Sequence, residues 1–337
     1  LAIIVFDQLR HGGQFRALAF KAPGECNALA MSASAEDVQI DRARGIAYLS
    51  YLDRRAQVEG KPVFGTVMLV DLNAPDPRPR PALVADPPNF RPHGMSLYRA
   101  GDGSLRLFVI SHPPGAEHEV HIFEQGPTGA FALVETVRDP LLLRPNAIVA
   151  TGQRQFYVAN DSGARNGWQR AQEFLFRRGL SSVVYFDGER MRSVASGIKS
   201  AAGIGVSPDG SHLYVAETAG KRLRIYERVP ATGDLTLRES IDLGSAPDNV
   251  NVNADGSVWV AAHAKVLALV RSFASADHVA PTQILRFDPR ANGAARLQEI
   301  YVNGGEQISA GSVGAVYDKA LLIGSITDRK LLRCRLP

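Results

Sequence analysis

The sequence contains little cysteine, tryptophan or methionine, and it has no long apolar segment. Of its 337 residues, 2 are cysteine, 2 are tryptophan and 4 are methionine. The two cysteines do not form a Cys-x-x-Cys pair, which argues against zinc binding and thioredoxin-type redox chemistry. No stretch reaches the roughly 20 consecutive apolar residues that a membrane-spanning helix needs.

Charge is spread along the chain, and several catalytic motifs are absent. The 38 Lys and Arg residues slightly outnumber the 34 Asp and Glu residues, which gives a formal net charge of +4 without a basic block. We therefore expect no nucleic-acid partner. There is no Gly-x-Ser-x-Gly nucleophile elbow, no phosphate-binding Gly-x-x-x-x-Gly-Lys loop and no dinucleotide-type Gly-x-Gly-x-x-Gly. Their absence disfavours serine hydrolases, nucleotide enzymes and dehydrogenases.

The chain begins with a short apolar run, Leu1–Phe6, followed by polar and basic residues. Two interpretations stay open for it: the remnant of a removed signal or anchor segment, or a terminal segment that packs on the body. No Pro/Ser-rich linker divides the rest of the chain. We therefore expect an N-terminal segment over residues 1–25 and a single domain over residues 26–337.

Short strand patterns recur in pairs around turn signals. Asp-Gly pairs at 102–103, 209–210 and 255–256 each come before an apolar or alternating strand, and they predict two-residue hairpin turns. Three further pairs bring the total to about six units at a spacing of roughly 45–65 residues, which is within the range of β-propeller blades with insertions. The predicted pairs include Val38–Ile40 with Ile46–Ser50, Ile148–Ala150 with Phe156–Ala159, and Val313–Tyr317 with Leu321–Ile326.

The segment 166–178 has a different pattern. Trp168, Phe174, Leu175 and Phe176 alternate with Arg, Gln and Glu, which predicts an inserted amphipathic helix. Such a helix could pack on the blades, cover an active site or touch a lipid surface.

Metal-binding residue types stand before successive β-rich segments. They are Glu36-Asp37, His93, Asn146 and Asp248-Asn249. Calcium takes six to eight hard oxygen ligands, which carboxylates and Asn carbonyls can supply. If the strand starts converge on one axis, these residues form a single oxygen-rich site. The structural alternative is that Asp and Asn cap turns at the strand starts.

Six short motifs, in order along the chain, resemble the paraoxonase/arylesterase family of calcium-dependent six-bladed β-propellers. They are Ser34-Ala-Glu-Asp-Val38, Pro92-His-Gly-Met-Ser96, Ser111-His-Pro113, Pro145-Asn-Ala-Ile148, Ala202-Gly-Ile204 and Asp248-Asn-Val250. The resemblance extends from about Cys26 to Cys334 and implies an all-β propeller closed by a Cys26–Cys334 disulfide. Two unrelated free thiols are the alternative. A disulfide predicts an oxidising compartment, for a periplasmic, secreted or membrane-anchored protein.

The resemblance implies that Glu36, Asn146, Asp248 and Asn249 hold one calcium ion in the central tunnel. The chain departs from the family at two positions. Ala202 stands where the family has an Asn ligand. Ala147 replaces an aspartate that holds a second, structural calcium, which leaves Asp37 and the Met95 carbonyl for that site. Because two ligands are too few for Ca²⁺, we expect the second ion to be weak or absent.

The same resemblance assigns roles to histidines. His93 matches the base that activates water, His112 its supporting partner, and His263 a residue that contacts substrate. Asp161 and Asp248 are alternative bases or nucleophiles, and a structural role is the alternative for each histidine. The remaining ones are expected to be surface or strand residues: His11, His118, His121, His212 and His278.

The sequence is thus identified as a calcium-dependent hydrolase of lactones and aryl esters, with phosphotriesters as side substrates. The expected partner is a small hydrophobic lactone or ester. Association with a membrane or lipid surface through residues 1–25 or the helix at 166–178 is a further hypothesis. Two other functions stay open: a non-catalytic binding propeller, favoured by Ala202 and Ala147, and a sugar lactonase that uses the same metal tunnel without a histidine pair.

Overall fold

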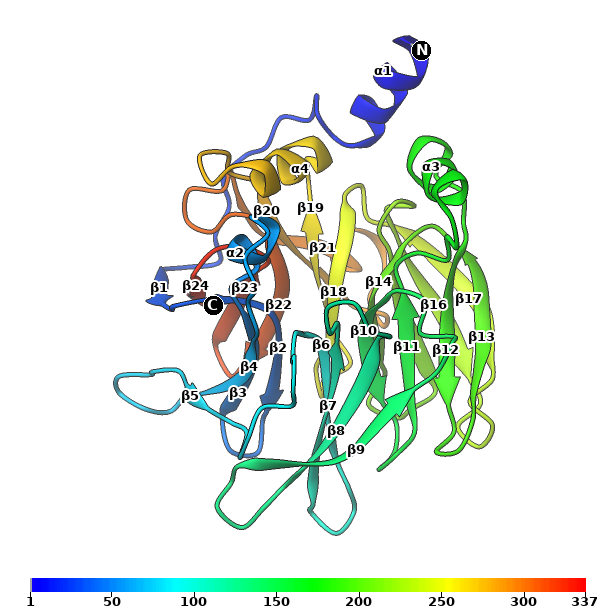
Figure 1. Cartoon of the computed structure of the whole chain (residues 1–337). Helices are drawn as coiled ribbons and strands as arrows, with labels where there is room; N and C mark the ends of the chain where they lie inside the picture. Colours follow the sequence, from blue (N-terminus) through cyan, green and yellow to red (C-terminus); the bar gives the residue numbers. More distant parts are fainter. Residues whose placement is uncertain (1) are drawn as a thin grey trace.

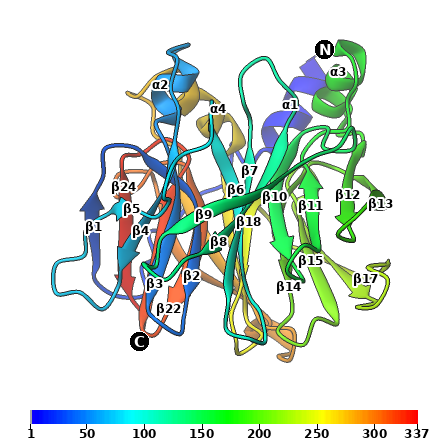
Figure 2. The same cartoon turned by 60° about the horizontal axis from the view of Figure 1, so that its bottom comes forward.

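Each blade of the structure is a four-stranded antiparallel sheet, and six such sheets surround one axis. The computed structural model describes residues 2–337, with side chains described from Phe6 onward. Within these residues the chain forms the predicted all-β, six-bladed β-propeller (Figures 1 and 2). The innermost strands contact one another around the axis. They are β2 (Ser34–Asp41), β6 (Pro92–Arg99), β10 (Pro145–Ala150), β14 (Ala201–Val206), β18 (Ala246–Val252) and β22 (Gly311–Tyr317).

The other three layers of strands follow outward in the same order. The second strands are β3 (Ile46–Leu52), β7 (Leu105–Ser111), β11 (Phe156–Asn160), β15 (His212–Glu217), β19 (Val258–His263) and β23 (Ala320–Ser325). The third strands are β4 (Thr66–Asp71), β8 (Glu119–Gln125), β12 (Ser181–Phe186), β16 (Arg222–Arg228), β20 (Thr282–Phe287) and β24 (Lys330–Arg335). The outermost strands are β5 (Arg80–Pro81), β9 (Phe131–Arg138), β13 (Met191–Ile198), β17 (Leu235–Asp242), β21 (Leu297–Asn303) and β1 (Cys26–Ala30).

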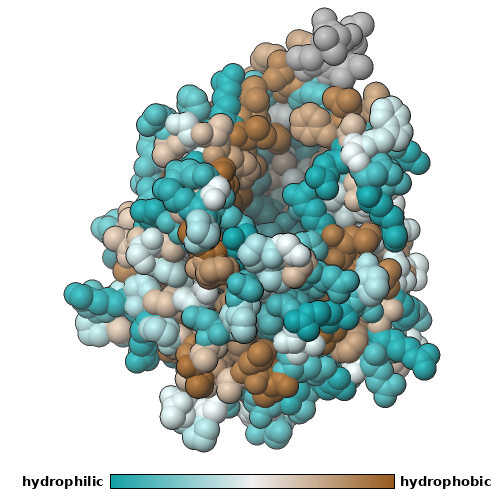
Figure 3. Space-filling model, in the orientation of Figure 1, coloured by the Kyte–Doolittle hydropathy of each residue, from teal (hydrophilic) through white to brown (hydrophobic). Residues whose placement is uncertain are grey.

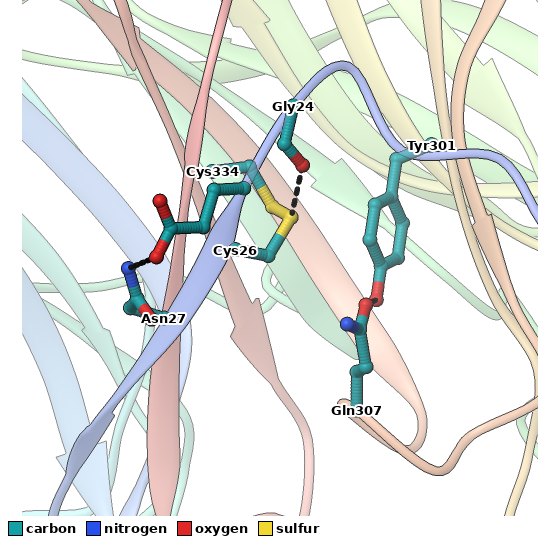
Figure 4. Close-up of a disulfide and its surroundings, with 7 residues drawn as sticks. Gly24, Cys26, Asn27, Tyr301, Gln307 and Cys334 are labelled. Atoms are coloured by element: carbon teal, nitrogen blue, oxygen red, sulfur yellow. Dashed lines mark hydrogen bonds between the residues drawn. A yellow bond between two sulfur atoms is a disulfide. The ribbon is translucent and has the colours of Figure 1, made fainter.

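The ring is closed by the two ends of the propeller. Strand β1 pairs antiparallel with β24, so that Cys26 lies opposite Cys334. These two residues form the predicted disulfide, which joins positions 308 residues apart (Figure 4). The alternative of two free thiols is therefore excluded. A structural disulfide indicates an oxidising compartment.

The core lies between neighbouring blades. Inner and middle strands are buried along nearly their whole length, because each sheet packs against a sheet on both faces. Between the first and second blades, for example, Tyr48, Phe90, Leu107 and Phe123 belong to one buried cluster. The outermost strands bury only some of their residues. For that reason four of them, β9, β13, β17 and β21, carried too weak a pattern to be predicted.

The Asp-Gly turns connect inner to second strands as predicted, but with a different geometry. Gly103, Gly210 and Gly256 adopt φ values of 86°, 72° and 81°, whereas the preceding aspartates are not in the left-handed region. A two-residue type I′ turn needs positive φ at both positions. The hydrogen bonds show longer loops, with the Ala100 N–H donating to the Ser104 carbonyl across the first of them. The prediction of two-residue turns was wrong.

The α-helices lie at one end of the propeller (Figure 1). They are α1 (Ala2–His11), α2 (Arg54–Val58), α3 (Gly167–Phe176) and α4 (Val266–Ala274), and a 3₁₀ turn, η1, covers Gly293–Ala295. Helix α3 confirms the helix predicted near 166–178, and the Asn166 side chain caps it by accepting from the Gln169 N–H. Among the described residues, none of the helices combines the length and apolar character needed to cross a membrane.

Helix α1 contacts α3. Gln8 Nε2 donates to the Leu175 carbonyl at 2.7 Å, and Arg177 pairs with Asp7 at 2.6 Å. His11 Nε2 lies 2.8 Å from the Ala219 carbonyl. Part of the N-terminal segment therefore packs on the helical end. Within the apolar run at Leu1–Phe6, Leu1 lies outside the described residues, and the side chains are described only from Phe6.

Candidate active site

A β-bulge interrupts every innermost strand at the same level near its start. In each blade one extra residue on the inner strand is left out of the pairing with the second strand. A bulge re-aims the side chains at its position and bends the strand. The residues at the six bulges are Glu36-Asp37, His93-Gly94, Asn146, Ala202, Asp248-Asn249 and Ser312. All four predicted ligands and His93 thus occupy equivalent positions around the axis.

The second strands end at the level of these bulges and deliver further side chains. Pro92 pairs with Ser111, which brings His112 beside His93. Pro145 pairs with Asn160, so that Asp161 follows at the level of Asn146. The antiparallel hairpin therefore explains why motifs about 15 to 20 residues apart meet at one end of each blade.

Glu36 is the centre of the hydrogen-bond network on the axis. It is 2% exposed, and its Oε1 accepts from Asn249 Nδ2 at 2.8 Å. Its backbone carbonyl accepts from Asn249 Nδ2 at 3.1 Å and from Ser312 Oγ at 2.7 Å. Its second carboxylate oxygen, Oε2, lies 3.5 Å from His93 Nε2 and 3.9 Å from Arg54 Nη2. Burial raises the pKa of the Glu36 carboxyl, and the nearby Arg54 charge opposes this rise.

Three histidines form a row that leads away from Glu36. His93 Nδ1 lies 2.9 Å from His112 Nε2, and His112 Nδ1 lies 2.9 Å from His118 Nδ1. Burial, followed by the charges of Arg54 and Arg144, lowers the pKa of His93 to about 3. Burial also lowers the pKa of His112 and His118. The row is therefore neutral at pH 7, and each ring can accept a proton on one nitrogen while donating one from the other.

Two further pairs surround the axis. His263 Nε2 lies 2.9 Å from Asp248 Oδ2, and burial raises the pKa of the Asp248 carboxyl while this hydrogen bond opposes the rise. Asp161 contacts Arg144 at 3.0 Å and accepts weakly from Asn146 Nδ2 at 3.4 Å. Burial raises the pKa of Asp161 to about 6. His263 is thus a partner of Asp248, and it is not among the residues that line the cavity described below.

Asp37 faces away from this network and links the first two blades. Its carboxylate accepts from the Met95 N–H on β6 at 2.7 Å and from the Val38 N–H at 2.7 Å. The group that contacts Asp37 is therefore the amide of Met95 and not the carbonyl that a second calcium would use. Burial and the charge of Glu36 raise the pKa of Asp37 to about 7. The hydrogen bond gives the two inner strands a direct crosslink at this place.

Buried oxygens without hydrogen-bond partners indicate how well the axis suits a cation. Glu36 Oε2 and Asn146 Oδ1 are buried and accept no hydrogen bond. Unpaired buried oxygens are costly, and a hard cation such as calcium would satisfy them. Within the described part of the chain, no three His, Cys, Asp or Glu side chains come together as a metal cluster. The four predicted ligands are two carboxylates and two asparagines, which are oxygen donors that suit calcium. Ala202 places a methyl group at its bulge, so this set has one ligand side chain fewer than the family resemblance implies.

A cavity of about 520 Å³ lies above the network. His93, His112, His118 and Asp161 line it, and the space-filling view shows the molecule hollowed at the helical end (Figure 3). Four arginines also line it: Arg54, Arg91, Arg144 and Arg170. Two larger cavities lie elsewhere, beside the outer strands near the disulfide and near Trp259. Of these three cavities, the one over the histidines is lined by predicted catalytic residues, namely His93, His112 and Asp161.

Four residues of the site were not predicted from the sequence: Ser312, His118, Arg54 and Arg144. The repeat could have identified Ser312, because it occupies the bulge of the last blade. His118 was expected to be a surface or strand residue, but it lies half-buried in a loop against His112. That contact depends on how the loop after β7 folds back. No periodic signal marks Arg54, which follows β3 in the short helix α2.

The His93 imidazole is expected to stay neutral from pH 8 down to about pH 5, because burial and two arginines oppose its protonation. Unfolding restores an ordinary pKa near 6.5, so the contribution of His93 to stability is present above about pH 6.5 and is lost as the pH falls. Imidazole ¹⁵N NMR measures this, with His93→Gln to assign the resonance and histidine amide as the control. A midpoint near 6.5 for His93 would contradict the burial argument.

Relatives of this chain are found among serum paraoxonases. Human serum paraoxonase/arylesterase 1 is 30% identical over 278 residues, which cover 81% of this chain and 77% of the human protein. Human serum paraoxonase/lactonase 3 is 29% identical over 325 residues, which cover 93% of this chain and 89% of that protein.

Solved structures share the fold at low identity. A luciferin-regenerating enzyme aligns with a TM-score of 0.58 and 11% identity over 93% of this chain and 95% of its own. Regucalcin from Agrobacterium tumefaciens, described as a calcium-binding protein, aligns with a TM-score of 0.53 and 15% identity over 94% of this chain and 95% of its own. A model of the arylesterase family matches residues 57–336. The chain belongs to the paraoxonase/arylesterase family.

Proposed function

We propose that this protein is a calcium-dependent hydrolase of lactones and aryl esters. The observation that carries the proposal is the neutral histidine row that begins 3.5 Å from the Glu36 carboxylate, beside buried oxygens that lack partners. His93 and His112 line the cavity, and Glu36, a proposed ligand of the cation, lies beside His93. The names of the relatives, arylesterase and lactonase, indicate the reaction class.

Glu36, Asn146, Asp248 and Asn249 would hold the calcium ion. When bound, calcium would polarise the ester or lactone carbonyl and stabilise the negative charge that develops on its oxygen. His263 orients Asp248 through its hydrogen bond, and Ser312 holds the backbone of Glu36. These contacts restrict the ligands to one arrangement before substrate arrives.

The histidine row provides a route for the proton of the attacking water. With Nδ1–H directed at His112, His93 presents a free lone pair at Nε2 on the side of Glu36. After His93 Nε2 accepts a proton, its Nδ1 proton can pass to His112 Nε2, and the His112 Nδ1 proton to His118 Nδ1. His118 is half-buried and lines the cavity, so it can release a proton from Nε2 to solvent.

Metal analysis followed by hydrolysis assays tests the proposal. The purified protein is expected to carry about one calcium per chain, and chelation is expected to abolish hydrolysis of a panel of lactones and aryl esters, with recovery when calcium is restored. A protein that binds calcium and hydrolyses none of the panel would instead be a binding propeller. Hydrolysis that survives the double substitution His93→Gln and His112→Gln would favour a sugar lactonase that needs no histidine pair.

The helical end carries an exposed apolar surface, and we propose that it contacts lipid. Phe15, Phe20, Trp168 and Phe174 are each more than 60% exposed, and hydrophobic residues gather over α4 (Figure 3). Arg170 lies on α3, and Arg177 and Arg178 follow its last residue. Basic residues beside apolar ones are typical of helices that lie on anionic bilayers. With the disulfide, this surface supports a periplasmic, secreted or membrane-anchored location.

Co-sedimentation with anionic phospholipid vesicles tests the lipid contact. The double variant Trp168→Ser and Phe174→Ser is expected to lower the bound fraction about tenfold or more, because both rings leave water on binding. Leu237→Ser, an exposed hydrophobic on the outermost strand β17, is the matched control and is expected to bind like the unmodified protein. Equal binding by the double variant would rule out this surface.

A further inference from the structure

The cavity over the histidine row is strongly biased toward positive charge. Four arginines and three neutral histidines line it, against a single carboxylate, Asp161, which is already paired with Arg144. Arg91 is also engaged, since its Nε donates to the Val63 carbonyl and its guanidinium lies over Phe64. Such a lining is poorly suited to the hydrophobic substrate that the sequence led us to expect.

Arg54 is the buried member of this set. It is only 8% exposed, and its Nη2 donates to the Pro92 carbonyl at 2.7 Å. Its Nη1 is buried and has no hydrogen-bond partner. A buried guanidinium donor that is left unpaired is costly, so an acceptor is needed in the cavity that Arg54 lines.

Glu36 does not satisfy this donor. Its nearest contact with Arg54 joins Oε2 to Nη2 at 3.9 Å, which is too long for a hydrogen bond and does not involve Nη1. Contacts of the neighbouring residue Asp53 also fix the position of Arg54. Asp53 caps α2 by accepting from the Ala56 N–H, and the Asp53 carboxylate pairs with Arg329 at 2.7 Å. Arg54 is therefore held in place with its Nη1 unpaired.

We propose that the substrate is an ester or lactone that carries a carboxylate, and that Arg54 binds this carboxylate through Nη1. Arg144 also lines the cavity and adds positive charge for the same group. The inference rests on the proposed hydrolase function and names its substrate class. Arg54 is a specificity-determining residue, because it recognises a part of the substrate that does not react.

Two esters of matched shape test the substrate class. Phenyl hydrogen glutarate carries a carboxylate where phenyl 5-methylhexanoate carries an isopropyl group, and phenol release measures both. The unmodified protein is expected to prefer the glutarate in kcat/KM. Arg54→Met is expected to reduce the ratio of the two kcat/KM values about tenfold to 100-fold, mainly through KM, because one charge-assisted hydrogen bond is lost. Arg54→Lys, which keeps the charge, is expected to retain part of the preference.

Arg55→Met is the matched control on the same helix. Arg55 donates to the Ser272 carbonyl and does not line the cavity, so the ratio is expected to stay as in the unmodified protein. A ratio that Arg54→Met leaves unchanged would overturn the proposal, and equal losses on both esters would assign Arg54 to the reacting carbonyl instead.

Calorimetric titration with glutarate separates failure of this inference from failure of the hydrolase function. If neither ester is hydrolysed, the proposed function fails, but the titration still reports whether the cavity takes a carboxylate. Glutarate is expected to bind the unmodified protein and to bind Arg54→Met at least about tenfold more weakly. No binding, or equal binding by a variant shown to be folded by circular dichroism, would overturn the carboxylate site.

Discussion

Replacing Glu36 with glutamine is expected to reduce kcat/KM for ester and lactone hydrolysis by about 100-fold to 1,000-fold, since a group that organises charge at the reacting centre is neutralised. Glutamine keeps the size of the side chain but removes the negative charge. It also places an amide either against the Asn249 Nδ2 donor or on the side of Arg54, whose guanidinium can only donate. The affinity for calcium is expected to fall as well, because a carboxylate ligand is replaced by a neutral one.

The neighbouring carboxylate offers a matched control for this substitution. Asp37 stands next to Glu36 on the same bulge, but its oxygens accept from the Met95 and Val38 amides. Asp37→Asn is expected to keep calcium bound in the tunnel and to lower the free energy of unfolding by about 1–3 kcal/mol, because a buried crosslink is weakened. Calcium titration and thermal unfolding of both variants separate the two roles. If Glu36→Gln binds calcium and hydrolyses esters normally, the axis is not the active site.

The positions of the site residues were predictable because the blades repeat. Glu36, His93, Asn146 and Asp248 each begin a blade, and the repeat alone implies that they meet on one axis. The bulges that turn them inward occur at the same level in all six blades. A repeating backbone therefore converts sequence spacing into spatial proximity.

The residues that the connections between strands add to the site were not predictable in this way. Arg54 and His118 lie in connections between second and third strands, where the blades differ in length and structure. The direction of the Arg54 side chain depends on the short helix α2, and the direction of the His118 side chain depends on how the loop after β7 folds. The hydrophobic substrate expected from the sequence followed from the family alone. The arginines around the cavity favour a charged one.

Removing the disulfide with Cys26→Ala and Cys334→Ala is expected to lower the free energy of unfolding by about 5 kcal/mol, because a crosslink between distant residues restricts the unfolded chain. The bond joins positions 308 residues apart. Without it, closure depends on the five residue pairs between β1 and β24. Urea unfolding followed by circular dichroism measures the loss, with reduced unmodified protein as the control that must match the double variant. Midpoints that do not differ between oxidised protein and double variant would contradict this account.

The same closure is expected to protect the active site. Strands β2 and β22 belong to the first and last blades and contact each other across the seam of the ring. The hydrogen bond from Ser312 Oγ to the Glu36 carbonyl crosses this seam, so opening the ring displaces a ligand of the proposed calcium site. The double variant should therefore lose hydrolysis at a lower urea concentration than the unmodified protein, and added calcium should raise that concentration, because a ligand of the folded state stabilises it. Hydrolysis that persists beyond the unfolding of β1 would show that the seam and the site are independent.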